Sequence, residues 1–208
     1  MLSKNIYINK KNFYVYSIIF FISTLIAVYL FEFYLAFTNN KILSNLYGKT
    51  KLDVIEELNK QKINSFLNIN PSMFVKSNGI KDEFDNTLYP LGSISNIVTI
   101  LDNELGYFPK INTDKFGFNN PKIQYSKKID LILLGDSFTE GCCVNTEHNI
   151  ASNLIKSGLS TLNFGKSGNG PLIELATLIE YGKIYKPKNV IWIYCNNDLE
   201  DLKNEIKS

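Results

Sequence analysis

Three short polar segments carry the residue types that acyl-transfer chemistry needs. Each follows an apolar run of the sequence: GDSFTEG (135–141), NFGKSGNG (163–170) and CNNDL (195–199). A serine at the point where a strand turns into a helix presents its hydroxyl for nucleophilic attack, and Ser137 occupies such a point. Ser137, Gly168 and Asn197 are separated by 31 and 29 residues. Each interval matches one strand and one helix, so we expect the three segments to meet at one edge of a sheet.

Three hydrogen-bond donors in these segments suit the oxyanion of an acyl-transfer intermediate, which needs donors fixed about 3 Å away. They are the backbone N–H groups of Ser137 and Gly168 and the side-chain amide of Asn197. Gly168 has no side chain to obstruct a substrate. Other roles stay open: Ser137 as a helix cap, Gly168 as a turn residue and Asn197 as the cap of a following helix. Taken together, the three segments favour Ser137 as a nucleophile.

Alternating apolar and helical stretches after residue 128 predict the scaffold for these segments. We predict strands over 129–134, 161–164 and 190–194 and helices over 149–157 and 172–181. Strands that alternate with helices form right-handed βαβ units and a parallel sheet. Strands that are apolar throughout are covered by helices on both faces. The predicted fold class is therefore α/β, with a parallel sheet of about three strands.

The three segments, in this order and at this spacing, resemble blocks I, II and III of the SGNH (GDSL-type) hydrolases, over roughly residues 88–203. Members of that family are serine esterases and O-acyltransferases with a flavodoxin-like fold. The resemblance implies strand order 2-1-3, Ser137 as nucleophile, Gly168 and Asn197 as the oxyanion-hole pair, Asp136 as organiser of the first loop, and no cofactor. The stretch ELGYFPKINTDKFGFNNP is similar to membrane-anchored members associated with surface-polysaccharide modification, which implies O-acetyl groups of envelope glycans, or another small ester, as substrate.

Two features depart from the family pattern. Cys195 stands where block III usually has glycine, two places before Asn197. The family takes its general base from a D-x-x-H block after two further strands, whereas the one histidine here, His148, is predicted to lie in the first turn of a surface helix. We therefore expect this chain to be the front portion of an SGNH protein, with the Asp–His pair supplied from beyond residue 208. The alternative is a catalytically silent module that binds a glycan or an assembly partner.

An uncharged run near the N-terminus predicts a membrane anchor. Residues 13–31 contain no charged side chain, and as a helix they span about 29 Å, the thickness of a hydrocarbon core. We expect a retained anchor over 13–37 rather than a buried core helix or a cleaved signal peptide, because no small-x-small cleavage site follows. The nearest lysines are Lys4, Lys10 and Lys11 before the run and Lys41 behind it. The positive-inside rule places the N-terminus in the cytosol and the remainder in the periplasm or outside the cell.

The chain between the anchor and the sheet is predicted to be less regular. Residues 40–66 are expected to be helical and amphipathic, and among them Thr50 and Asp53 have the spacing of a capping box. Residues 67–98 contain prolines and glycines without a clear period and are predicted to be mostly loop. The predicted division is a cytosolic tail (1–12), an anchor (13–37), a membrane-proximal helix and loop (38–89), a lead-in with short strands (90–128) and a partial hydrolase domain (129–208).

Composition argues against several other classes of protein. The formal net charge is +2 and every basic residue is lysine, which argues against nucleic acid as a partner. The glycine positions match neither a Walker loop nor a dinucleotide fingerprint.

Cys142, Cys143 and Cys195 are expected to be small buried hydrophobes, with a Cys143–Cys195 disulfide as the other option. Carboxylates with histidine or cysteine at metal-ligand spacing are absent, so no metal site is predicted.

Overall fold

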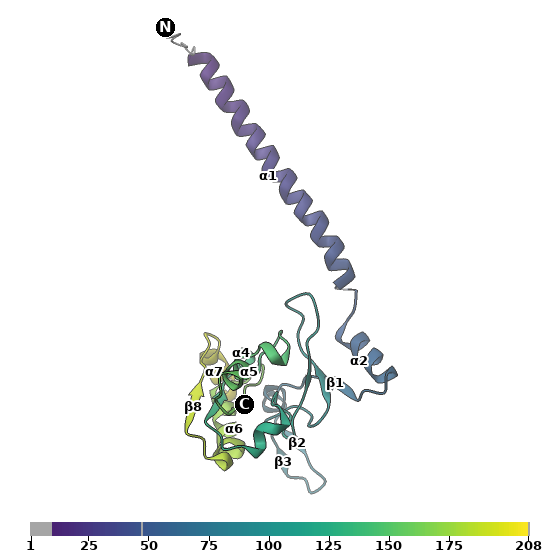
Figure 1. Cartoon of the computed structure of the whole chain (residues 1–208), viewed down its shortest axis with the longest axis vertical. Helices are drawn as coiled ribbons and strands as arrows, with labels where there is room; N and C mark the ends of the chain where they lie inside the picture. The colour runs from purple at the N-terminus through teal and green to yellow at the C-terminus, as the bar shows by residue number, and fades with distance from the viewer. Residues whose placement is uncertain (1–9, 47, 208) are drawn as a thin grey trace. The chain divides into compact units, whose positions relative to one another are not determined.

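The computed structural model describes residues 10–46 and 48–207. The chain divides into two compact units, Met1–Gly48 and Lys49–Ser208. The first contains α1 (Lys10–Leu46), which is one unbroken helix (Figure 1). The predictions for residues 1–9, including Lys4 in the expected cytosolic tail, lie outside the described residues.

The helix α1 is long and apolar enough, by length and composition, to cross a membrane over Asn12–Phe37. That span contains the predicted anchor. The hydroxyls of Ser17, Ser23 and Thr24 each donate to a carbonyl oxygen three or four residues earlier at 2.9 Å. These three hydroxyls are therefore satisfied within the helix, as polar groups surrounded by lipid must be.

The second unit begins with α2 (Lys51–Lys60), which is shorter than the helix predicted within 40–66. The predicted capping box is confirmed: the Thr50 hydroxyl accepts from the Asp53 backbone N–H at 3.2 Å, and the Asp53 carboxylate accepts from the Thr50 backbone N–H at 2.6 Å. The apolar face of α2 packs against a small sheet. The buried members of this cluster are Val54, Ile55, Leu58 and Ile100.

Residues 65–112 contain two small sheets and one short helix, and most of residues 67–98 lie outside helices and strands, as predicted. The first sheet pairs β4 (Val98–Ile100) in parallel with β1 (Ser65–Leu67) and antiparallel with β5 (Lys110–Asn112). The second is a hairpin of β2 (Ile80–Lys81) and β3 (Thr87–Leu88), preceded by α3 (Ser72–Lys76). Elements this short carry too few residues to show a period in the sequence. The short strands expected in the lead-in are confirmed by β4 and β5.

The third sheet contains the strands that were predicted to position the polar segments. Its order is β7-β6-β8, and both pairings are parallel. The strands are β6 (Leu131–Leu134), β7 (Thr161–Asn163) and β8 (Asn189–Trp192). In chain order this arrangement is 2-1-3. The strands β6 and β7 are buried, whereas all four residues of β8 are exposed, so the expected cover is incomplete at β8 within the described residues. The three strands are drawn in Figure 1.

The remaining helices surround this sheet. They are α4 (Ser137–Glu140), α5 (Ile150–Lys156), α6 (Pro171–Thr177) with a π-helical turn η3 (Leu178–Gly182), α7 (Asp198–Lys207), and the 3₁₀ turns η1 (Lys122–Ser126), η2 (Thr146–His148) and η4 (Lys183–Tyr185). The central core is a cluster of buried residues from the lead-in and the sheet, namely Phe118, Ile129, Ile132, Leu134, Leu162 and Phe164. Tyr181 and Tyr185 close this core from the η3–η4 side.

Candidate active site

Ser137 is the first residue of α4, and two residues separate it from the end of β6. Gly135 has a φ of +148°, a value that residues with a side chain rarely adopt. The Asp136 carboxylate caps α4 by accepting from the Phe138 backbone N–H at 3.1 Å. Gly141, at a left-handed φ of +74°, ends the helix. These two turns hold Ser137 half-buried at the carboxyl edge of β6, as the sequence predicted.

The third polar segment contacts the first through Asp136. The Asn197 side-chain nitrogen donates to Asp136 Oδ2 at 3.2 Å and to Asp201 Oδ2 at 2.9 Å. The Cys195 thiol lies 3.5 Å from Asp136 Oδ1, and burial followed by the Asp136 carboxylate raises the pKa of this thiol to about 11. Asp136 therefore organises the loop. The amide of Asn197 is directed at two carboxylates and must turn away from one of them to serve as an oxyanion donor.

The second polar segment contacts the first through a buried ion pair that sequence reasoning missed. Lys166 Nζ donates to Glu140 Oε1 and, at 2.5 Å, to Asn68 Oδ1. The Ser167 backbone N–H donates to Glu140 Oε2 at 2.9 Å. Burial opposes ionisation of Glu140, but the Lys166 ammonium and the Ser167 bonds outweigh it and lower the pKa of this carboxyl. The pair fixes the backbone directly before Gly168.

Gly168 has a left-handed turn conformation, and it lines a different pocket from Ser137. Its φ is +74°, and it is exposed. A side-chain carbon at this position would lie 3.1 Å from the Ser72 hydroxyl and 3.7 Å from the Asn70 amide nitrogen. The small pocket that it lines also includes Asp201, the second partner of Asn197. Gly168 is thus linked to Asn197 through Asp201 and to α4 through its neighbour Ser167.

A pocket of about 430 Å³ opens beside Ser137. Much of its wall is apolar: it includes Leu105, Phe138, Val144 and Ile150, with Glu104, Cys142, Cys143, His148 and Asn149 among the polar members. His148 lies in η2, before α5 rather than in its first turn, and its side chain is exposed. A pocket of this size, with a largely apolar wall and a few polar groups, suits a small-molecule ligand.

Glu174 is a further titratable group near the three segments that the sequence did not reveal. It lies on α6, is fully buried and accepts a hydrogen bond from Trp192 Nε1. Burial raises its pKa to about 7, with the Asp198 and Asp136 carboxylates adding to the effect and the Trp192 bond opposing it. Glu174 is thus a carboxyl whose proton exchanges near neutral pH within the electrostatic reach of Asp136.

The three cysteines are free thiols, and no Cys143–Cys195 disulfide is present. Cys143 Sγ lies 3.0 Å from Cys142 Sγ, the residue next to it in the chain. Cys195 lies beside Asp136. The alternative of a bridge between the first and third segments is therefore wrong.

Comparisons with protein-family models, with curated proteins and with solved structures found no match. The fold and the site define a mixed α/β protein with an N-terminal apolar helix and a small parallel sheet. Polar loops follow each strand of that sheet at its carboxyl edge.

Proposed function

We propose that this chain is the membrane-anchored, nucleophile-bearing part of an SGNH-type serine esterase or O-acyltransferase that acts on O-acetyl groups of envelope glycans. The proposal includes a flavodoxin-like sheet, a cytosolic N-terminus and a catalytic part outside the cytosol. The substrate class rests on the resemblance of the sequence to anchored members of that family. The largely apolar wall of the pocket beside Ser137 is compatible with the acyl part of such a substrate.

The observation that carries the proposal is the set of hydrogen bonds that joins the three loops. Asn197 contacts Asp136, the residue before Ser137, and Ser167, the residue before Gly168, contacts Glu140 in the helix that Ser137 begins. Segments 31 and 29 residues apart thus lie at one edge of one parallel sheet. Acyl transfer needs this convergence, because nucleophile and oxyanion donors must act on the same carbonyl group.

In the proposed reaction Ser137 Oγ attacks the acyl carbonyl carbon and loses its proton to a general base. The tetrahedral oxyanion is held by the N–H groups of Ser137 and Gly168 and by the Asn197 amide. Collapse breaks the bond to the glycan oxygen, which takes the proton and leaves an acyl group on Ser137. A water molecule, or the hydroxyl of an acceptor, then removes that group.

The proposed reaction needs a general base that removes the proton of the Ser137 hydroxyl. Among residues 10–46 and 48–207, the side chain hydrogen-bonded to the Ser137 hydroxyl is the Cys142 thiol. Burial followed by nearby carboxylates raises the pKa of that thiol, which makes it a weak candidate for removing the proton. His148 lines the same pocket, but no hydrogen bond joins it to Ser137. We propose that an Asp–His pair from elsewhere in the protein supplies the base.

The test is acyl transfer by the full-length protein, purified in detergent. Release of acetate from an O-acetylated glycan is measured together with acetylation of the peptide that contains Ser137, by mass spectrometry. We expect Ser137→Ala to abolish both, and Ser126→Ala, which changes an exposed serine, to leave both intact. Equal acetate release by Ser137→Ala would exclude this nucleophile.

A silent binding module is the second candidate, and one observation favours it. The side-chain nitrogen of Asn197, the expected oxyanion donor, is directed at Asp136 and Asp201. If the protein binds the glycan, releases no acetate and is never acetylated at Ser137, the three loops have a structural role and no catalytic one. Binding that is unchanged in Ser137→Ala would support this candidate, whereas a trapped acetyl group on Ser137 would exclude it.

A further inference from the structure

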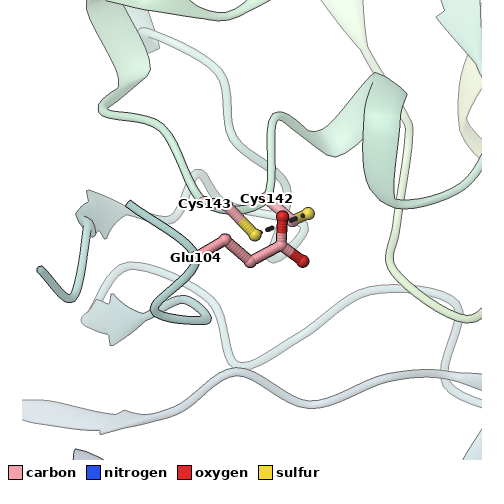
Figure 2. Close-up of side chains that lie close together, drawn as sticks. All are labelled: Glu104, Cys142 and Cys143. Carbon is pink, nitrogen blue, oxygen red and sulfur yellow. Dashed lines mark hydrogen bonds between the residues drawn. The ribbon is translucent and has the colours of Figure 1, made fainter. Parts of the chain in front are cut away.

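Glu104, Cys142 and Cys143 form a cluster beside Ser137 that the proposed acyl transfer does not use. One ligand-type atom from each, the Glu104 carboxylate oxygen and the two sulfurs, lies within 4.8 Å of the others. Figure 2 shows the three side chains directed toward one another. Glu104 lies on the loop between β4 and β5, and the cysteines lie on the turn after α4. This separation in sequence explains why residue spacing gave no sign of a metal site.

The backbone after α4 is shaped so that two adjacent cysteines face the same way. Neighbouring side chains in an extended strand point to opposite sides. Here Cys143 has a φ of +72°, in the left-handed region that residues with a side chain seldom occupy. The turn brings the two sulfurs to 3.0 Å. Strained backbone of this kind is found at ligand clamps, where surrounding structure holds it in place.

The cluster has negative charge without a matching positive side chain. Within the described residues, no lysine or histidine nitrogen lies within ion-pair distance of Glu104, whose carboxylate instead contacts the Cys143 thiol. A divalent cation bound among these groups would supply the missing positive charge.

We propose that Glu104, Cys142 and Cys143 bind one thiol-seeking divalent cation of the zinc type. Zinc takes sulfur ligands at about 2.3 Å and carboxylate oxygens at about 2.0–2.2 Å. In a tetrahedral site these lengths place two sulfurs about 3.8 Å apart and a sulfur and an oxygen about 3.6 Å apart. The sulfurs, now 3.0 Å apart, need to separate by less than about 1 Å, which rotation of two side chains allows.

Binding forms two metal–sulfur bonds and one metal–oxygen bond, and the two thiols release two protons to solvent. The cation keeps its charge and no redox step occurs. A water molecule completes a tetrahedral set, since three protein ligands leave one position open. The three residues line the 430 Å³ pocket that Ser137 also lines, so a ligand in that pocket has access to the open position. The proposal does not depend on Ser137 acting as a nucleophile.

The experiment is a titration of the full chain, reduced and purified in detergent, with Cd²⁺ and then Zn²⁺. We expect one Cd²⁺ per chain with a thiolate-to-metal charge-transfer band, and displacement of Cd²⁺ by Zn²⁺. Cys142→Ser and Cys143→Ser should each weaken binding about 100-fold or more, and Glu104→Gln about 10-fold. Because a thiol loses its proton when it ligates a metal, affinity should fall as the pH is lowered.

Matched controls are Cys195→Ser, the remaining thiol, and Glu83→Gln, an exposed carboxylate in another loop. Both should bind Cd²⁺ as the unaltered protein does. Loss of the charge-transfer band in Cys195→Ser, or its retention in Cys142→Ser and Cys143→Ser, would overturn the site. A Cys142–Cys143 disulfide that resists reduction, seen as one free thiol per chain and no bound Cd²⁺, would overturn it as well. Circular dichroism of each variant separates lost binding from lost folding.

Discussion

At the scale of single residues, the Glu140–Lys166 pair connects the first two loops inside the protein. Both side chains are buried. Glu140→Gln leaves a buried ammonium without its counter-ion, so we expect the free energy of unfolding to fall by about 3–5 kcal/mol. The measurement is urea unfolding in detergent, followed by the fluorescence of Trp192, the single tryptophan. Since the pKa of Glu140 is lowered, this stabilisation is present above about pH 4.5 and is lost on acidification.

Two variants serve as controls for the expected decrease in the free energy of unfolding of Glu140→Gln. Glu147→Gln changes an exposed carboxylate and should alter the free energy of unfolding by no more than about 0.5 kcal/mol. Glu140→Leu combined with Lys166→Met replaces the pair by apolar groups and should be more stable than Glu140→Gln alone. An unfolding free energy of Glu140→Gln equal to that of Glu147→Gln would show that the pair does not stabilise the loops.

Glu174 should make stability depend on pH in the opposite direction. Its pKa is raised from 4.5 to about 7 in the folded protein. A raised carboxyl pKa favours folding fully below the ordinary value, and this contribution disappears as pH rises through 7. Glu174→Gln should therefore leave Tm unchanged relative to the unaltered protein near pH 4 and increase it near pH 8. Glu180→Gln, on the exposed side of the same segment, should show no such difference; a pH-independent shift for Glu174→Gln would contradict the assignment.

The sequence motifs identified residues at strand ends and turns. They did not identify residues that stand out only because the fold buries them. Ser137 and Gly168 have the turn positions expected of them, because glycine conformation and strand ends leave a mark in the sequence. Glu140, Lys166 and Glu174 carry no such mark. A lysine or glutamate is usually exposed, and only the fold shows that these three are enclosed.

At the scale of elements, the packing of α4 on the second loop depends on Gly165. A side-chain carbon there would lie 2.4 Å from Thr139 Cβ and 2.5 Å from the Glu140 backbone nitrogen. Gly165→Ala should therefore push α4 away and lower the free energy of unfolding by about 1–3 kcal/mol or more. If the proposed function is right, it should also slow acyl transfer at Ser137.

Gly158→Ala is the matched control for this steric argument. Nothing lies within 4 Å of a side-chain carbon at that position, and its φ is +91°. Its cost should be limited to backbone strain of about 1–2 kcal/mol, with acyl transfer unaffected. If Gly165→Ala leaves both stability and acyl transfer as they are in Gly158→Ala, α4 does not depend on this close contact.

An element could be predicted when it was marked by a local pattern of residues. It could not be predicted when it was very short or was stabilised by residues far away in the sequence. The strands β6, β7 and β8 were predicted because each is a run of apolar residues between turn residues, and the Thr50–Asp53 box was predicted from two positions. The hairpin β2–β3 was not, and α7 (Asp198–Lys207) was anticipated only as the helix that Asn197 would cap. The backbone N–H groups of Gly170 and Leu172 donate to Glu205 of α7, a contact between distant segments that no local pattern contains.

At the scale of the whole molecule, the apolar helix α1 carries the prediction that the protein is anchored in a membrane. If Asn12–Phe37 crosses the membrane, the full chain should stay in the membrane fraction after alkaline washing, and a chain lacking 13–37 should not. Leu25→Lys places a charge near the centre of the span at a cost of about 2.5–3.5 kcal/mol and should reduce the membrane-bound fraction. Leu52→Lys, outside the span, is the control and should leave that fraction unchanged.

The orientation predicted from the lysines that precede the span can be tested apart from insertion. With a tag at either end of the chain, protease added to intact cells with a permeable outer layer should remove the C-terminal tag and spare the N-terminal one. Changing Lys10 and Lys11 to glutamine should increase the fraction with the reverse orientation, because the charge bias on that side then depends on Lys4. A protected C-terminal tag would place the second unit in the cytosol, away from envelope glycans. A mature chain that begins after residue 37 would identify the helix as a cleaved signal peptide.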